Sequence, residues 1–258
     1  MLQLSDTHLF GEMNATLLGL NTEASLLAIL EDIKALNTTF DFILLTGDLS
    51  QDASAAAYER LSRHVKGFAC PSFWLPGNHD NFDLMQAHLK GEWMHAAKVI
   101  TAGNWQVLLL NSQVPGKVHG YINEEQIAFL EEHLCQAQQK HTLIALHHHP
   151  IPMDCDWIDN IGVKNQDEFW AVLSRFSNVK GVLWGHVHQQ LDVCKNTIQC
   201  MSTPSTCVQF KPNSCDFAAD DIGPGYRILE LQSDGVIKTE VRRIHDPELK
   251  VDFSIKGY

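Results

Sequence analysis

The chain has 258 residues, which suits one large domain or two small ones with a substantial buried core. Its 19 Lys and Arg stand against 31 Asp and Glu, and the formal net charge of −12 disfavours nucleic-acid polymers and anionic membranes as partners. No apolar run approaches the roughly 18 residues that span a bilayer, and we expect no signal peptide. The seven scattered cysteines lack a CxxC pair, which favours free thiols in a cytoplasmic protein.

The N-terminal third alternates short apolar runs with helical patterns. A short strand over Met1–Leu4 precedes a helix that we expect Thr22 to cap. Phe42–Leu45 is uniformly apolar and too short for a helix, so it predicts a buried strand. A second helix is expected over Ala53–Val65 and a third strand over Phe73–Leu75.

The middle of the chain continues this alternation. Asn123 and Gln126 resemble a capping box and predict the start of a helix. A further helix carries Phe169 and Leu173, after a polar, irregular segment over 151–165. Apolar strands are expected at Trp105–Leu110, Thr142–Leu146 and Val179–Trp184.

The last part of the chain has a different character. Leu191–Val193 and Thr197–Met201 flank Lys195-Asn196, which predicts a hairpin, and Tyr226–Leu231 with Val236–Arg242 predicts a second one. We therefore interpret residues 191–258 as a β-rich part of the same domain as the rest, so that 1–258 form one α/β domain with two sheets between helices.

Potential metal ligands follow five of the predicted strands. Asp, Asn and His form a mixed oxygen and nitrogen set, which suits Mn, Fe, Zn or Co better than a structural zinc cage. One ion does not need so many ligands, so we expect two ions that share a bridging carboxylate. Enzymes use this two-metal arrangement for in-line displacement at phosphorus. The five blocks are Asp6-Thr7-His8, Gly47-Asp48, Gly77-Asn78-His79-Asp80, His147-His148-His149 and Gly185-His186-Val187-His188.

Each block is common alone, and the order of all five after strands makes the signal specific. Residues two apart at a strand end point to one face, which allows both members of a pair to reach one ion. A bridging hydroxide held by both ions is then the nucleophile. The predicted ligands are Asp6, His8, Asp48 as the bridge, Asn78, His147, His186 and His188.

One catalytic task is left for a residue that is not a ligand. His79 lies beside Asn78 and is our candidate for the general acid that protonates the leaving oxygen. Asp80 is expected to orient His79 or a ligand imidazole. Asn78 and His79 are therefore also expected to contact the substrate.

The five blocks together resemble the calcineurin-like metallophosphoesterase superfamily over nearly the whole chain. Other stretches resemble a narrower group, the bacterial class III cyclic-AMP phosphodiesterases. These stretches are Asp6-Thr7-His8-Leu9-Phe10, Gly19-Leu20-Asn21-Thr22, Gly47-Asp48-Leu49-Ser50-Gln51-Asp52, His147-His148-His149-Pro150-Ile151-Pro152, Gly185-His186-Val187-His188-Gln189 and Ser202-Thr203-Pro204-Ser205-Thr206-Cys207-Val208-Gln209-Phe210.

The resemblance implies a four-layer α/β/β/α sandwich that hydrolyses a 3′,5′-cyclic nucleotide, cyclic AMP, to the 5′-monophosphate. It also implies that His79 lies near the substrate phosphate. It implies one ion held by Asp6, His8, Asp48 and His188, and a second held by Asp48, Asn78, His147 and His186.

Several assignments stay open. The family often has two His before proline, and this chain has three. Aligning Pro150-Ile151-Pro152 with the family's proline pair favours His147 as the ligand, and His148 stays as the alternative. Asn21 is a candidate for contacting phosphate or sugar. Trp157 and Phe210 offer a stacking surface for a purine or belong to the core. Arg227 pairs with phosphate or, in the reading we prefer, with an acidic neighbour.

Rival functions share much of this site. A broader phosphodiesterase, acting on glycerophosphodiesters or 2′,3′-cyclic nucleotides, needs the same ligands. A non-catalytic metal-binding scaffold has no use for His79, and an oxidoreductase with a facial triad has none for Asn78. The sequence does not identify the metals, the selectivity for adenine or the oligomeric state.

Overall fold

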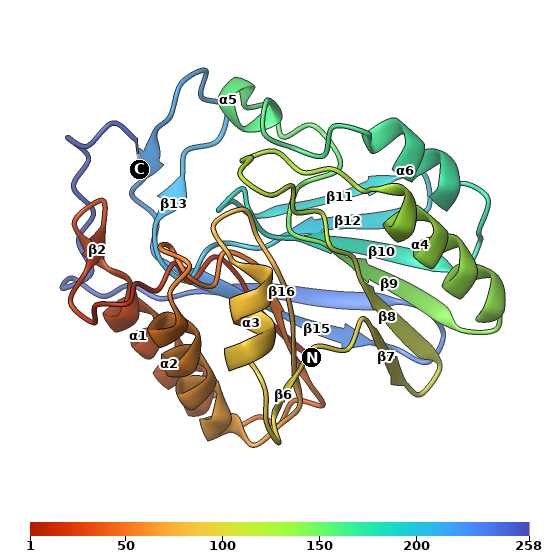
Figure 1. Ribbon diagram of the computed structural model, residues 1–258, viewed down its shortest axis with the longest axis horizontal. Helices are drawn as coiled ribbons and strands as arrows, with labels where there is room; N and C mark the ends of the chain where they lie inside the picture. The colour runs from red at the N-terminus through yellow and green to blue at the C-terminus, as the bar shows by residue number, and fades with distance from the viewer. Residues whose placement is uncertain (258) are drawn as a thin grey trace.

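The computed structural model describes residues 1–257 and contains two six-stranded sheets packed face to face (Figure 1). In the order of their pairing, the strands of the first sheet are β16 (Ile237–Arg243), β15 (Gly225–Leu231), β1 (Leu2–Leu4), β4 (Ile43–Thr46), β5 (Ser72–Leu75) and β6 (Met94–His95). Those of the second are β11 (Leu191–Lys195), β12 (Ile198–Ser202), β10 (Val179–Trp184), β9 (His141–Ala145), β8 (Trp105–Leu109) and β7 (Val99–Ala102).

Helices cover the outer face of each sheet, which produces the four-layer α/β/β/α sandwich expected from the sequence. The first sheet carries α1 (Thr22–Ala35), α2 (Ala55–Val65) and α3 (Phe82–His88). The second carries α4 (Glu124–Gln136), α5 (Asp156–Asp159) and α6 (Gln166–Leu173). The smaller elements are η1 (Lys66–Phe68) and the two-stranded ribbons β2 (Thr16–Leu17) with β3 (Leu20–Asn21), and β13 (Gln209–Phe210) with β14 (Ala219–Asp220).

Three apolar cores hold the layers together. The central core lies between the sheets, where Leu44 and Leu75 of the first sheet meet Val107, Leu143 and Leu183 of the second. The other two cores lie between each sheet and its helices. Strands buried on both faces require continuous apolar runs, which explains why Phe42–Leu45 and the Val182–Trp184 end of β10 show no alternation.

The C-terminal part of the chain completes both sheets. The hairpin β11–β12 extends the second sheet, and the hairpin β15–β16 pairs with β1 of the first. Both predicted hairpins are confirmed. Arg227 on β15 is fully buried and pairs with Asp192 on β11, 2.6 Å away, so the preferred reading of Arg227 is also confirmed. This ion pair ties the two sheets together.

The ends of some elements differ from the predictions. The expected Thr22 cap is wrong, because the side chain of Asn21 accepts from the Ala24 amide and caps α1. Helix α2 begins at Ala55, two residues later than expected, because Ser54 caps it and Ala53 has a left-handed backbone. Helix α3 and the edge strands β6 and β7 were not predicted. Within residues 1–257, no helix combines the length and apolar character needed to cross a bilayer.

Candidate metal centre

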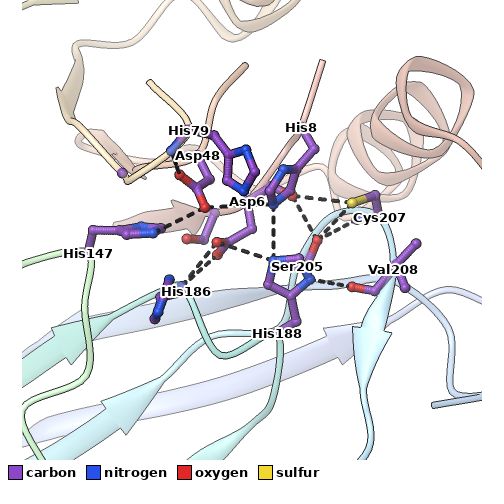
Figure 2. Close-up of polar contacts among 12 residues, drawn as sticks. Asp6, His8, Asp48, His79, His147, His186, His188, Ser205, Cys207 and Val208 are labelled. Atoms are coloured by element: carbon purple, nitrogen blue, oxygen red, sulfur yellow. Dashed lines mark hydrogen bonds and ion pairs between the residues drawn. The ribbon is translucent and has the colours of Figure 1, made fainter. Parts of the chain in front are cut away.

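The parallel strands of the two sheets bring all five ligand blocks to one edge. β1, β4 and β5 run parallel in the first sheet, and β9 and β10 run parallel in the second. Carboxyl ends of parallel strands share an edge, where open α/β sheets bind ligands. Figure 2 shows side chains from both sheets converging there.

The backbone at this edge adopts a conformation that non-glycine residues rarely use. Five predicted ligands have positive φ values of 45–66°, namely Asp6, His8, Asp48, His186 and His188. Such residues cost energy and persist where the surrounding structure holds them, typically at functional sites. The turns aim successive side chains of different strands into one small volume.

One half of the centre joins the first and last blocks. The Nε2 atoms of His8 and His188 lie 3.1 Å apart, and His188 Nε2 lies 3.4 Å from Asp6 Oδ1. His8 Nδ1 lies 2.5 Å from Gln51 Oε1, and His188 Nδ1 lies 2.7 Å from the Val208 carbonyl. Each Nδ1 is placed to donate to an oxygen, which leaves each Nε2 facing the centre.

The other half joins β4, β5 and β9. His147 Nε2 lies 3.3 Å from Asp48 Oδ2 and 3.2 Å from Asn78 Oδ1, while its Nδ1 donates to the Thr46 carbonyl. His186 approaches this half, and its Nε2 lies 3.2 Å from the carbonyl of Ile161. Its Nδ1 is consequently the atom left to bind an ion. Asp48 Oδ2 also lies 3.9 Å from His8 Nε2, so this carboxylate is common to both halves.

The structure distinguishes the neighbouring rings of His147 and His148. His148 is buried and uses both nitrogens within the protein: Nδ1 lies 2.8 Å from Ser112 Oγ, and Nε2 lies 3.1 Å from the Val118 carbonyl. The Nε2 atom of His147 instead faces Asp48 and Asn78. This geometry favours His147 as the ligand.

The protonation of the centre follows from burial and from the carboxylates. Burial lowers the pKa of His8 to about 3 and that of His186 well below its usual range, so both rings are neutral. At His147 burial acts in the same direction, but the adjacent Asp48 charge outweighs it and raises the pKa to about 9. Although burial opposes ionisation of Asp48, the charges of His147 and His79 hold its pKa well below normal. The centre therefore combines neutral rings at His8 and His186 with an ion pair between His147 and the ionised Asp48 carboxylate.

These donors fit divalent ions. Zinc-type bonds to nitrogen and oxygen measure about 2.0–2.2 Å, so neighbouring ligand atoms on one ion lie roughly 3.0–3.5 Å apart. The four separations of 3.1–3.4 Å within the two halves fall in that range. The Nε2 atoms of His8 and His188, 3.1 Å apart, have the separation expected of two nitrogen ligands on one cation. The donor set contains no thiolate, which agrees with Mn, Fe or Zn.

Two predicted site residues have other tasks. The buried Asp80 carboxylate accepts hydrogen bonds from the backbone of Leu49, Ser50 and Gly77 and from the Tyr58 hydroxyl. Within residues 1–257 these hydrogen bonds reach no imidazole, so they do not support the expected orientation of a ring by Asp80. It joins the loops after β4 and β5 instead.

Asn21 is likewise committed to the protein. Its Oδ1 caps α1, and its Nδ2 lies 3.4 Å from the Met13 carbonyl. The expected contact with phosphate or sugar is not among its hydrogen bonds in the described chain. Its side chain holds the loop after β1 against α1.

His79 lies at the mouth of the centre. Its backbone amide donates to Asp48 Oδ1 at 2.8 Å, and its ring lies 5.1 Å from the His8 ring, edge to face. His79 and Asn78 are half-buried, whereas Asp6, His8 and Asp48 are buried. The half-buried pair therefore marks the side from which a ligand reaches the centre.

Phe210 belongs to the wall behind the centre. It is buried, and its ring stacks on His188 with centroids 4.0 Å apart and planes 4° from parallel, while Trp157 packs against its edge. The alternative that Phe210 is a core residue is confirmed. Sequence reasoning did not identify the groups that orient the rings, namely Gln51 and the carbonyls of Thr46 and Val208. The only feature of the sequence that could have pointed to Gln51 is its position three residues after the ligand Asp48.

The four-layer sandwich, with a carboxylate shared between two groups of donors at the strand ends, defines a two-metal phosphoesterase class. The calcineurin-like phosphoesterase model matches residues 1–190, and the chain belongs to this family. In Escherichia coli K12, the 3′,5′-cyclic adenosine monophosphate phosphodiesterase CpdA is 45% identical over 259 residues, covering 100% of this chain and 94% of that protein. CpdA of Pseudomonas aeruginosa is 39% identical over 258 residues with the same coverage.

Solved structures agree on the fold. A dimetal phosphatase from Danio rerio superposes with a TM-score of 0.64 at 14% identity, covering 88% of this chain and 93% of that one. A purple acid phosphatase from yellow lupin gives 0.60 at 13% identity, covering 94% and 51%. At these identities the likeness supports the architecture alone.

Proposed function

We propose that this protein is a 3′,5′-cyclic-AMP phosphodiesterase that depends on two divalent ions and produces 5′-AMP. The observation that carries the proposal is the complete donor set around Asp48, in a chain that is similar over its whole length to CpdA. Family members used only as scaffolds do not need such a set. The substrate is a small diester, which a strongly acidic protein can bind where metal ions dominate the local field.

The chain supplies two sets of ligands that share Asp48. Asp6, His8, Asp48 and His188 would hold one ion, and Asp48, Asn78, His147 and His186 would hold the other. When bound, such a pair of ions neutralises charge on the phosphoryl oxygens and lowers the pKa of a coordinated water. Gln51 and the carbonyls of Thr46 and Val208 keep three of the rings in the required orientation.

His79 acts on the leaving group. The water oxygen forms a bond to phosphorus and gives up one proton to solvent, and the bond from phosphorus to the ribose 3′-oxygen breaks. His79 delivers a proton to that oxygen and regains one from solvent. Its backbone bond to Asp48 fixes the ring at the mouth, where the ribose side of the diester lies. General acids of this kind contribute about 10²–10⁴-fold.

We further propose that the enzyme works in the cytoplasm, with Mn, Fe or Zn according to supply. All seven cysteines are free, which suits a reducing compartment. Which metal occupies a site of oxygen and nitrogen ligands depends on metal availability as well as on affinity. No nucleic-acid polymer or membrane takes part.

The test is hydrolysis of cyclic AMP by the Mn-loaded protein, beside bis-p-nitrophenyl phosphate and the variant His79→Ala. We expect turnover to 5′-AMP that chelation abolishes. Because p-nitrophenolate leaves without a proton, His79→Ala should lower kcat for cyclic AMP by about 10²–10⁴-fold and for the aryl diester far less. The exposed His245→Ala is the matched control.

Other results redirect or reject the proposal. Turnover of the aryl diester alone retains the two-metal chemistry and moves the substrate to glycerophosphodiesters or 2′,3′-cyclic nucleotides. Failure with both substrates, when metal analysis shows two bound ions, identifies a non-catalytic scaffold. Equal loss with both substrates in His79→Ala removes the general-acid role.

A further inference from the structure

The centre is reached from one side only. Among the eight side chains that make up the proposed site, only Asn78 and His79 are partly exposed. The rings of His8, His147 and His188 are fully buried, and Phe210 stacks on His188. The part of a substrate that does not react must therefore extend past Asn78 and His79.

A cavity of about 540 Å³ lies next to Asn78. This volume falls within the roughly 300–1,000 Å³ of small-ligand sites. Its walls come from the start of α3, from the loop between β8 and α4, and from the N-cap of α4.

The walls present hydrogen-bonding groups that the fold leaves unused. The Oδ1 atoms of Asn81, Asn111 and Asn123 accept from the backbone amides of residues 84, 113 and 126 at 2.9–3.1 Å. Within residues 1–257, their three NH2 groups donate to no protein atom. Because each oxygen is fixed, each NH2 group has a defined position.

The loop that carries Asn111 is held rigidly beside the centre. Gln113 Nε2 donates to the carbonyls of Gly77 and Asp80, at 2.7 and 2.6 Å, and leaves its Oε1 as an acceptor at the cavity wall. Ser112 binds His148, whose ring packs against that of His147. A wall that is already ordered avoids the entropic cost of ordering it on binding.

We propose that this cavity binds the purine nucleoside part of the substrate, an inference that rests on the proposed function. Amide NH2 groups suit the ring nitrogens of adenine, and an amide oxygen suits its exocyclic amine. Phe82 adds an aromatic side chain to the wall. Among the described lining residues none is Lys or Arg, which argues against a second phosphate as the occupant.

The test uses Asn111→Asp and Asn81→Asp, which keep size and the oxygen acceptor and lose the NH2 donor. Asp caps a helix as well as Asn does, so Asn81→Asp retains the cap of α3. We expect each variant to raise KM for cyclic AMP about tenfold, because an acceptor then faces a ring nitrogen. KM for bis-p-nitrophenyl phosphate, which has no base, should change less than twofold.

Asn196→Asp is the charge-matched control. Asn196 lies in the exposed turn of the β11–β12 hairpin, at the amino end of β12 and so at the opposite edge of the sheet from the centre. Its left-handed φ of 57° is one that Asp also tolerates. Asn196→Asp controls for the substitution itself and for the net charge of the protein, because charges this far apart are screened. A local effect of the added charge in Asn111→Asp or Asn81→Asp appears with both anionic diesters.

The outcomes separate this inference from the proposed function. If the wild type hydrolyses cyclic AMP and both variants keep its KM, or raise KM equally for both diesters, the cavity does not bind the nucleoside. If the wild type does not hydrolyse cyclic AMP, the proposed function fails, and calorimetric binding of adenosine still tests the cavity. Weaker adenosine binding in Asn111→Asp than in Asn196→Asp supports the inference, and equal binding overturns it.

Discussion

The two halves of the candidate centre differ in how completely the protein encloses them. Around His8 and His188 every ligand is buried, and Phe210 stacks on His188. Around His147 the half-buried Asn78 opens the centre toward a cavity. The comparison suggests a division of labour in which the enclosed half retains its ion and the open half receives the substrate.

The halves also differ in what orients their rings. His8 is held by a side chain, Gln51, whereas His147 is held by the backbone carbonyl of Thr46. A backbone carbonyl of a central strand moves with the sheet and cannot be removed by substitution. Substitution can therefore remove the orienting group of His8, but not that of His147 or of His188, which the Val208 carbonyl holds.

Asp48→Asn should have the largest effect, because Asp48 is common to both halves. The left-handed φ of 48° suits Asn, and the acceptor for the His79 amide remains, so the fold should be retained. In other enzymes, the loss of one preorganised hydrogen-bond donor lowers kcat by about 10²–10³-fold. Because Asp48 is shared by both ions, we expect its loss to lower kcat by more than about a thousandfold. Steady-state kinetics and metal analysis measure this. Activity within tenfold of the wild type contradicts a shared Asp48.

Gly77→Ala should come next. A Cβ at Gly77 would overlap the Asp48 carboxylate, although the backbone there suits any residue. We expect kcat to fall about a hundredfold and the free energy of unfolding to fall by about 1–3 kcal/mol from overpacking. Gly67→Ala, where only the tip of Lys34 comes near, is the control for kinetics and for denaturant unfolding. If Gly67→Ala lowers kcat and stability as much as Gly77→Ala does, the overlap with the Asp48 carboxylate is not the cause.

Gln51→Leu probes the enclosed half alone. Without its acceptor, the His8 ring loses its orientation, and metal affinity should fall about 10–100-fold. Excess metal should restore most of the activity, and competition with a chelator measures the affinity. An unchanged metal affinity with a large fall in kcat would contradict this orienting role of Gln51, because Gln51 would then act on the substrate.

Ser112→Ala should have the smallest effect and tests the choice between His147 and His148. It removes a neutral hydrogen bond to His148, which costs about 1 kcal/mol of stability, and should leave metal affinity within about threefold. If His148 were the ligand, metal affinity should fall as in Gln51→Leu. The same titration of metal against chelator decides between the two.

The predictions from sequence held best where the evidence was local. Apolar runs identified the strands that precede the ligand blocks, and turn signals identified the hairpins at Asn196 and Gly235. Element ends were less secure, because two polar neighbours such as Asn21 and Thr22 compete to cap one helix. The short strands β6 and β7 lie at sheet edges, where half-exposed residues carry little periodicity.

By itself, the sequence determined the chemistry of the site: which residues offer oxygen or nitrogen, and that each block follows a strand. Only the tertiary structure decided which atoms meet. His8 and His188 are 180 residues apart, and their Nε2 atoms approach because two sheets pack along one edge. The roles of Gln51, Asp80 and the cavity wall at Asn111 were decided in the same way. Spacing along a chain constrains neighbours on one element, whereas packing between elements sets the contacts of distant residues.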